Sequence, residues 1–528
     1  MLSLFRMNNE QIKQLEKELW DSADNLRANS KLTATQYKDP VLGLILLRYA
    51  QNRYEEAKIA IEAAIPEGPR GKRAPTQADF LAAGSMMLPE KSQYGYLANL
   101  PEGEDISEAV NEAMRLIEAN YPDLAGVLPK NYQELESDLL RELIRVFNKD
   151  AVKGLKGDIF GRVYEYFLMK FSMIGAGAQE GGEFFTPPSL VQLIVNFIEP
   201  DHGIIHDPAC GSGGMFVQTG HFVECHGKHS VNEAIKVYGT EKISTTASLA
   251  KMNLAIHGIE GKIIESNSFY SDPHDLVGKC DFVMANPPFN VNKVDKKKDF
   301  VKTDKRLFSD VGLPKSDNGN YLWIQYFYHY LNERGRAGFV MASSATDAGA
   351  SEKLIRQRLI ETGAVDCIVA VGNSFFYTRS LPCHLWFLDR GKKPENKHKI
   401  LMIDARNTFR QVTQTLRDFS PEQMEGLTAI VKAYRSEDVA KQFASNPWLK
   451  EHFPSGEYED VEGLCKIVDL AEVEENDWSL TPGRYVGYSI ELDEDFDYTA
   501  RLGEIHSELA TLNDEATTLM QQILKGVA

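Results

Sequence analysis

Cysteine is scarce in this sequence. Its six cysteines are spread over 528 residues and never form a CxxC pair, which argues against a disulfide scaffold or a zinc ribbon and favours a reducing cytoplasm. No apolar run approaches the roughly 18 residues that a membrane span needs. Residues 1–6 lack the apolar segment of a signal peptide. The phosphate-binding GxxxxGK(S/T) motif is also missing, so we expect a cytoplasmic protein that is not a nucleotide-driven motor.

Net positive charge is lacking as well. The chain has 58 lysines and arginines against 76 aspartates and glutamates, which gives a formal net charge of −18. Binding to nucleic acid needs local positive charge, because lysine and arginine hold the phosphates. A nucleic-acid partner would therefore have to be bound by a local basic patch or through a second subunit.

The length predicts two or three domains. Residues 1–150 read as a mainly α domain, with Ile12, Leu15 and Leu19 at helical spacing. Residues 151–420 alternate short apolar runs with helical stretches, which is typical of a doubly wound α/β fold with a parallel sheet. Ligands of such sheets bind at the carboxyl ends of the strands. The predicted strands cover residues 204–206, 237–239, 263–264, 282–284, 338–341, 367–370 and 384–387.

The C-terminal part divides into two segments. Residues 421–497 are predicted to be a helical and acidic connector, and residues 471–497, which hold nine acids and one arginine, are predicted to be exposed. Residues 498–528 are predicted to form a coiled-coil-like helical tail, since apolar residues recur there at alternating spacings of four and three. An ordinary amphipathic helix packed on its own domain is the alternative. The apolar seam consists of Tyr498, Leu502, Ile505, Leu509, Leu512, Ala516, Leu519 and Ile523.

The strand predicted at 282–284 is followed by Asn286, Pro287, Pro288 and Phe289, the candidate catalytic residues. Proline cannot continue a sheet ladder, and the residue before it is pushed to an extended conformation. The turn would hold the Asn286 side chain and a carbonyl at the rim of the sheet, where both can accept hydrogen bonds from one amino group. Such acceptors favour a pyramidal nitrogen whose lone pair can attack, and Phe289 could stack on the ring that bears it. A simple loop turn is the alternative.

A glycine-rich segment follows the strand predicted at 204–206. It opens the next helix, where exposed N–H groups favour a carboxylate. It is not the GxGxxG dinucleotide fingerprint, and a glycine-rich turn alone is weak evidence. Its position adds weight, because an acid ends the next strand, where such folds hold ribose hydroxyls. The candidate ligand-binding residues here are Asp207, Gly211, Ser212, Gly213, Gly214 and Glu241.

A third segment precedes these two. Pro187 suits the start of a helix predicted at 190–197. By itself the segment is better explained as a helix N-terminus, although its aromatic residues beside a hydroxyl could close over a bound nucleoside. The residues are Glu183, Phe184, Phe185, Thr186, Pro187 and Pro188.

In this order and spacing, the three segments resemble the amino-methyltransferases of DNA, in the γ-class order of adenine-N6 enzymes. Further stretches look like the modification (M) subunit of type I restriction-modification systems, and the similarity covers about residues 12–415. It implies a Rossmann-like methyltransferase fold, S-adenosylmethionine as cofactor, and methyl transfer to N6 of adenine in duplex DNA. The stretches are residues 20–27, 37–49, 320–325, 335–340 and 401–406.

The resemblance also implies roles and partners. The Glu183–Pro188 and Asp207–Gly214 segments would hold the methionine part and the sulfonium, and Glu241 the ribose hydroxyls. Asn267 and Ser268 would lie near the adenine of the cofactor, although this chain has Glu-Ser-Asn-Ser-Phe where members more often have Gly-Asn-Thr-Leu. The implied partners are a specificity (S) subunit, a restriction (R) subunit and usually a second M subunit.

A run of lysines lies just after the candidate catalytic turn. In an acidic protein, lysines at this place could contact DNA phosphates near the target base. A solvated loop is the alternative. The lysines are Lys293, Lys296, Lys297, Lys298 and Lys302.

Other functions are open at this point. No metal is expected, because the methyl of a sulfonium is already activated and because the nearby His221, Cys225, His226 and His229 fit no standard zinc spacing. One alternative is methylation of another amino group, on cytosine N4, an RNA base or a protein glutamine. A non-catalytic cofactor-binding scaffold subunit is the alternative outside the enzymes.

Overall fold

The computed structural model describes most of the chain. It covers residues 9–487 except 68–70, 154, 156–162, 165, 172–185, 227–229, 315–317, 377–380 and 414–415. Beyond residue 487 it describes 503, 506, 507, 509, 510, 512, 513, 516, 517 and 520. The chain forms two compact units, residues 1–486 and 487–528.

The N-terminal helices surround one buried helix, α2 (Ala34–Ala64). Thr33 and Gln36 form a capping box at its start. Nearly every residue from Val41 to Ala50 is buried, so this helix is apolar on all sides, as a central core helix should be. The other helices of this domain are α1 (Asn9–Ala28), α3 (Gln77–Ala82), α4 (Tyr94–Ala98), α5 (Ile106–Asn120) and α6 (Ser137–Phe147).

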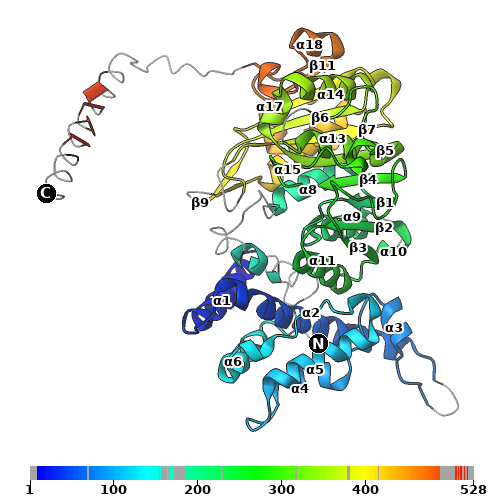
Figure 1. Cartoon of the computed structure of the whole chain (residues 1–528), viewed down its shortest axis with the longest axis vertical. Coiled ribbons are helices and arrows are strands. Elements are labelled where there is room, and N and C mark those ends of the chain that lie inside the picture. The colour runs from blue at the N-terminus through cyan, green and yellow to red at the C-terminus, as the bar shows by residue number, and fades with distance from the viewer. Residues whose placement is uncertain are drawn as a thin grey trace. The chain divides into compact units, whose positions relative to one another are not determined.

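A nine-stranded sheet follows, with helices on both faces (Figure 1). Its order is β11-β8-β6-β7-β5-β4-β1-β2-β3, and every predicted strand lies within one of β1 to β7. The strands are β1 (Gly203–Asp207), β2 (Ile235–Glu241), β3 (Gly261–Glu265), β4 (Cys280–Ala285), β5 (Leu331–Ala342), β6 (Val365–Val371), β7 (Cys383–Asp389), β8 (Lys399–Ala405) and β11 (Cys465–Asp469). A separate hairpin pairs β9 (Arg410–Thr413) with β10 (Leu416–Asp418).

The predicted doubly wound fold is confirmed, but the sheet is mixed rather than wholly parallel. β7 is antiparallel to both β5 and β6, and β11 is antiparallel to β8. The connection from β6 to β7, residues 372–382, is too short for the helical crossover that parallel neighbours need. The short apolar run at residues 384–387 predicts the strand β7, but such a run does not indicate whether the strand pairs parallel or antiparallel with its neighbours.

The strands alternate between two apolar cores. In β4, Phe282 and Met284 face a core shared with α8 (Pro188–Ile198), α9 (Gly214–His226) and α11 (Ser244–Ile256). Val283 and Ala285 face a second core shared with α13 (Asn320–Tyr330) and α14 (Ala350–Glu361). Burial on both faces explains why these strands read as continuous apolar runs. The remaining short helices of this region are α10 (Val231–Ala234) and α12 (Asp299–Lys302).

The N-terminal helices and the sheet domain share a core as well. Leu249 and Met252, both on α11, belong to the same apolar cluster as the residues of α2. The two domains are therefore joined by direct packing, which brings one end of α2 close to the sheet.

The segment predicted to be a connector, 421–497, is packed in its described part. β11 extends the sheet, and Val473, Leu480 and Tyr485 are buried. The Arg435 guanidinium donates to the buried Asp366 carboxylate at 2.8 Å and also donates to the Phe197 carbonyl. The expectation of an exposed acidic connector is wrong for the described residues 471–487, because apolar residues between the acids pack into a core of the sheet domain. The helices are α15 (Pro421–Tyr434), α16 (Ala440–Ser445), α17 (Pro447–His452) and α18 (Leu470–Glu475).

The described residues of the C-terminal unit are helical and exposed. Leu509 and Leu512 of the predicted seam are 57% and 53% exposed. Tyr498, Leu502, Ile505, Leu519 and Ile523 lie outside the described residues. Within the part of the chain that the structure describes, no helix is long and apolar enough to cross a membrane.

We predict that Gly338→Ala destabilises the sheet domain. A Cβ on this β5 residue would lie 2.8 Å from Ile194 and 3.0 Å from Ile198, both on α8. Overpacking of this kind costs about 1–3 kcal/mol. The matched control is Gly103→Ala, where no atom lies within 4 Å of the added Cβ. Urea unfolding followed by circular dichroism should separate the two variants, and equal stabilities would contradict the packing argument.

Candidate active site

The three candidate segments meet at the carboxyl edge of the sheet. β1 ends at Asp207, β2 ends at Glu241, and Asn286 follows the end of β4. Both β2 and β4 are parallel neighbours of β1, so these ends lie side by side. The chain builds β2 and β3 on one side of β1 and then crosses to β4 on the other, and such a switch point opens a ligand crevice.

A cavity of about 440 Å³ lies at this edge, and we call it the strand-end cavity. It is large enough for a small ligand, since typical ligand pockets measure roughly 300–1,000 Å³. Eleven of the candidate catalytic and cofactor-binding residues line it, together with Lys293 of the lysine run: Thr186, Pro188, Asp207, Gly211, Ser212, Gly214, Glu241, Asn267, Ser268, Asn286 and Pro288.

The glycine-rich turn forms one wall of the cavity. Gly211 and Gly213 adopt φ values of +54° and +80°, which are strained for a residue with a Cβ. The turn is fixed from below, because the Cys210 amide donates to the Thr240 carbonyl at 3.0 Å. Asn253 of α11 donates to the Ser212 carbonyl at 3.0 Å. The turn thus presents backbone to the cavity and is held by both β2 and α11.

Two carboxylates are buried in the same wall. Glu241 accepts the Gly211 amide at 3.0 Å on one oxygen and the Ile243 amide at 2.9 Å on the other. Asp207 is 1% exposed and accepts the Ala209 amide at 2.9 Å. Neither acid has a lysine, arginine or histidine partner among the described residues. Burial raises the pKa of the Asp207 carboxyl well above its usual range, and the nearby Glu241 raises it further.

The segment after β3 closes the cavity on the next side. Ser268 donates its hydroxyl to the Pro208 carbonyl at 2.5 Å, which ties this segment to the glycine-rich turn. Asn267 accepts the Phe269 amide at 3.0 Å. Both residues line the cavity, although the local sequence departs from the common family pattern.

Asn286 and Thr186 meet across the cavity mouth. The Asn286 amide nitrogen donates to the Thr186 hydroxyl at 2.9 Å, although the two residues are 100 positions apart in sequence. Two motifs recognised separately are therefore one structural unit. Pro187 is the residue before α8 and does not line the cavity. Glu183, Phe184 and Phe185 lie outside the described residues.

Phe289 is placed differently from its neighbours. It is 8% exposed, does not line the cavity, and packs edge-on against Phe376 with ring centres 6.3 Å apart. The turn after it is held by a reciprocal pair. The Asn290 backbone amide donates to the Asn320 side-chain oxygen at 2.9 Å, and the Asn320 side-chain nitrogen donates to the Asn290 side-chain oxygen at 2.9 Å.

The predicted lysines do not share one environment. Lys293 lines the strand-end cavity, whereas Lys297 and Lys302 are exposed. Lys296 donates to the Pro314 carbonyl at 2.9 Å, and the Lys298 ammonium lies 3.9 Å from the centre of the Tyr270 ring. The lysines therefore emerge from a loop that is itself packed on the cavity wall.

Sequence reasoning missed two contributions from the N-terminal domain. Lys38 on α2 and Leu168 both line the strand-end cavity. Lys38 lies in the family-like stretch 37–49 but was given no role, and Leu168 lies in no motif. The packing of the N-terminal helices and Leu168 in one cluster with α11 brings both to the cavity. Asn320 was noted only within a family stretch, and its position directly at the start of α13 was the one signal for its role.

Comparison with known proteins agrees with this geometry. Residues 155–494 match the family model of N-6 DNA methylases, and residues 15–147 match that of the HsdM N-terminal domain. A type I restriction enzyme MjaIX methylase subunit from Methanocaldococcus jannaschii is 35% identical over 97% of this chain and 90% of its own length. The HindI methylase subunit from Haemophilus influenzae is 32% identical over 81% of this chain and 94% of its own length.

A solved structure shares the fold. The methyltransferase subunit of a type I restriction-modification system from Streptococcus thermophilus superposes with a TM-score of 0.70 at 19% identity, covering 90% of this chain and 99% of its own. The matched family model spans most of the chain and includes every wall of the strand-end cavity that comes from the sheet domain. The chain therefore belongs to the N-6 DNA methylase family, among the methylase subunits of type I restriction enzymes.

Proposed function

We propose that this chain transfers a methyl group from S-adenosylmethionine to N6 of adenine in duplex DNA, as the modification subunit of a type I restriction-modification complex. The observation that carries the proposal is the strand-end cavity itself. It places a side-chain amide, Asn286, at the same edge as two buried carboxylates, Asp207 and Glu241.

The charge of the cavity wall suits this cofactor. Asp207 and Glu241 are buried without a basic partner among the described residues, which is costly unless a ligand compensates them. S-adenosylmethionine carries a sulfonium and an ammonium, both positive, and ribose hydroxyls that can donate to a carboxylate. Glu241 is the residue we assign to the ribose, and the Gly211–Gly214 backbone would hold the methionine part. Asn267 and Ser268 would lie beside the adenine.

The target side of the site is built around Asn286. The Asn286 amide nitrogen donates to the Thr186 hydroxyl. The amide oxygen, which is the acceptor of this side chain, would accept from the amino group of a target base. The carbonyl of Pro287 would accept the second amino hydrogen. The bound cofactor supplies a methyl already activated for displacement. The residues of the chain contribute orientation and hydrogen-bond acceptors, which position the nitrogen lone pair for attack.

A base must leave the duplex to reach this cavity. Base flipping costs about a few kcal/mol, which a pocket can recover through stacking and hydrogen bonds. Lys293 at the cavity and the exposed lysines beyond it, Lys297 and Lys302, would hold the phosphates around the flipped base.

The main test is transfer of labelled methyl from S-adenosylmethionine. The chain would be assayed together with its specificity subunit on DNA, RNA and protein. We expect label on adenine N6 of duplex DNA only. Label on RNA, on cytosine or on a glutamine would overturn the proposed substrate, and no label despite cofactor binding would favour a scaffold role.

We predict that Asn286→Ala abolishes methyl transfer, because loss of one such polar contact at the reacting group costs about 10²–10³ in rate. The Kd for S-adenosylmethionine should stay within about tenfold. The role of Asn286 is on the target amine rather than on the donor. Thr303→Ala, at an exposed residue further along the same loop that does not line the cavity, is the control and should stay active. Complete loss of cofactor binding by a folded Asn286→Ala protein in calorimetry would contradict the assignment.

We predict that Phe289→Ala weakens capture of the flipped base more than cofactor binding, because base stacking on an aromatic ring contributes about 1–3 kcal/mol. A fluorescent base analogue at the target position should stay stacked in the variant complex. Phe289 also packs on Phe376, so Phe376→Leu is the control for lost packing. Equal effects of the two substitutions would show that the ring acts through packing alone.

We propose further that a specificity subunit supplies the base-reading surface. A restriction subunit and a second M subunit would complete the complex. The net charge of −18 disfavours unaided binding to DNA. The C-terminal helix is our candidate docking element, because Leu509 and Leu512 expose an apolar seam that suits a helical partner.

We predict that the isolated chain does not methylate a defined sequence, and that removing residues 498–528 prevents co-purification with the specificity subunit while cofactor binding persists. Leu509→Ser with Leu512→Ser should have the same effect, whereas Asn513→Ser with Thr517→Ser should not. A truncated chain that still assembles and methylates normally would rule out this docking site. Site-specific methylation by the chain alone would rule out the need for a partner.

A further inference from the structure

Arg306 is buried, whereas the basic residues just before it in the sequence are exposed. It ends the basic run that starts at Lys293, yet its exposed fraction is 0%, while Lys302 and Lys305 are exposed. Burying a guanidinium costs several kcal/mol unless it is fully compensated. A charge kept inside the protein at that cost points to a specific task.

The compensation is complete. Arg306 Nε donates to Asp304 Oδ1 at 2.8 Å and Nη2 to Asp304 Oδ2 at 2.6 Å, in a buried two-point pair. The other Nη2 hydrogen reaches the Ser268 carbonyl at 2.9 Å. Nη1 donates to the Tyr330 hydroxyl at 2.9 Å and lies 3.5 Å from the Ser271 carbonyl. All five N–H groups of the guanidinium have acceptors, a geometry that lysine cannot reproduce.

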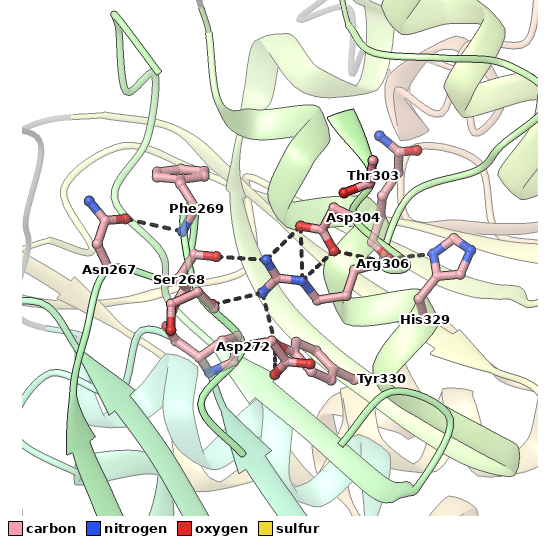
Figure 2. A network of polar contacts seen from close by, with 12 residues as sticks. Asn267, Ser268, Phe269, Asp272, Thr303, Asp304, Arg306, His329 and Tyr330 are labelled. Carbon is pink, nitrogen blue, oxygen red and sulfur yellow. Dashed lines mark hydrogen bonds and ion pairs between the residues drawn. The ribbon is translucent and has the colours of Figure 1, made fainter. Parts of the chain in front are cut away.

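Figure 2 shows that this network joins three separate segments. Asp304 and Arg306 come from the loop after the catalytic turn, Ser268 comes from the segment after β3, and Tyr330 comes from α13. Tyr330 extends the network to Asp272, because its hydroxyl donates to the Asp272 carboxylate at 3.0 Å. The Arg306 guanidinium also lies 3.9 Å from the centre of the Tyr326 ring, so its flat face is covered.

Ser268 gives the network its link to the site. Its carbonyl accepts from Arg306, and its hydroxyl donates to Pro208 in the glycine-rich turn. A second contact ties the same two regions together nearer the start of the loop. The Asp295 amide donates to the Tyr270 hydroxyl at 2.9 Å, and Tyr270 lines the strand-end cavity. The loop is therefore attached to the cavity wall at two points, Tyr270 and Ser268.

We propose that Arg306 is a positioning residue that holds the cavity wall at residues 267–271 and the lysine loop at residues 293–306 as one rigid unit. The inference rests on the proposed function, in which this wall contacts the adenine of the cofactor and the loop contacts DNA. Its consequence is that one buried side chain governs both affinities. The exposed lysines of the loop should govern only the affinity for DNA.

Arg306→Lys tests this positioning role, because it keeps the positive charge and removes the planar guanidinium that makes the two-point pair with Asp304. With the full chain bound to its specificity subunit, calorimetry should show a Kd for S-adenosylmethionine about tenfold higher, the loss expected when a buried charged hydrogen bond is removed. The Kd for target DNA should rise as well. Lys302→Gln should raise the Kd for DNA and leave that for the cofactor unchanged.

The matched control is Arg358→Lys. Arg358 on α14 pairs with Asp310 of the same connection between β4 and α13 at 2.7 Å, but it is 40% exposed and does not line the cavity. It should leave both Kd values within about twofold, as exposed ion pairs contribute little. If Arg306→Lys does not fold, Tyr330→Phe removes one contact of the same guanidinium and should raise the cofactor Kd about threefold.

The outcomes separate this proposal from the proposed function. A folded Arg306→Lys or Tyr330→Phe protein with a lower melting temperature and wild-type cofactor affinity would overturn the positioning role. So would equal effects of Arg306→Lys and Arg358→Lys on the cofactor Kd. A wild-type complex that does not bind S-adenosylmethionine at all would instead contradict the proposed function.

Discussion

The parallel pairing of β1 with both β2 and β4 is the constraint on which the site depends. It brings the ends of three strands to one edge, so Asp207, Glu241 and Asn286 are neighbours although the sequence spreads them over some eighty positions. The backbone at each end is fixed by hydrogen bonds within the sheet, and the side chains leave it in defined directions. Moving any one strand would separate these three side chains, and with them the proposed cofactor and target sides of the cavity.

Two groups of buried charge can be compared among the described residues. Arg435 with Asp366 and Arg306 with Asp304 are closed pairs, in which each charge meets an opposite charge inside the fold. Asp207 and Glu241 have only backbone donors among the described residues and face a cavity. The first group holds segments together. The second group differs from the buried Arg48 and Arg356, which have neutral acceptors inside the fold, because Asp207 and Glu241 face a cavity where a ligand could compensate them.

The sequence predicted the parts of the fold that local patterns determine. Apolar runs located β1 to β7, and prolines and glycines located the turns at Asp207 and Asn286. The direction of β7 and the packing of residues 421–487 depend on which strands become neighbours in the sheet. An apolar run in the sequence does not indicate which strands pair. Lys38 and Leu168 enter the cavity only through packing between domains. The burial of Phe289 depends on Phe376, which lies far away in sequence.

An acidic chain can act on DNA if its few positive charges are concentrated where the DNA phosphates lie. The lysines after the Asn286–Phe289 turn extend from a loop that packs on Tyr270 through Lys298 and on Tyr326 through Arg306, and these contacts restrict the loop before any phosphate binds. A rigid loop loses less conformational entropy on binding than a mobile one. The negative charge elsewhere on the chain weakens attachment to arbitrary DNA. In the assembly we propose, discrimination would come from the partner that reads the sequence, while this chain would contribute the local contacts at the target base.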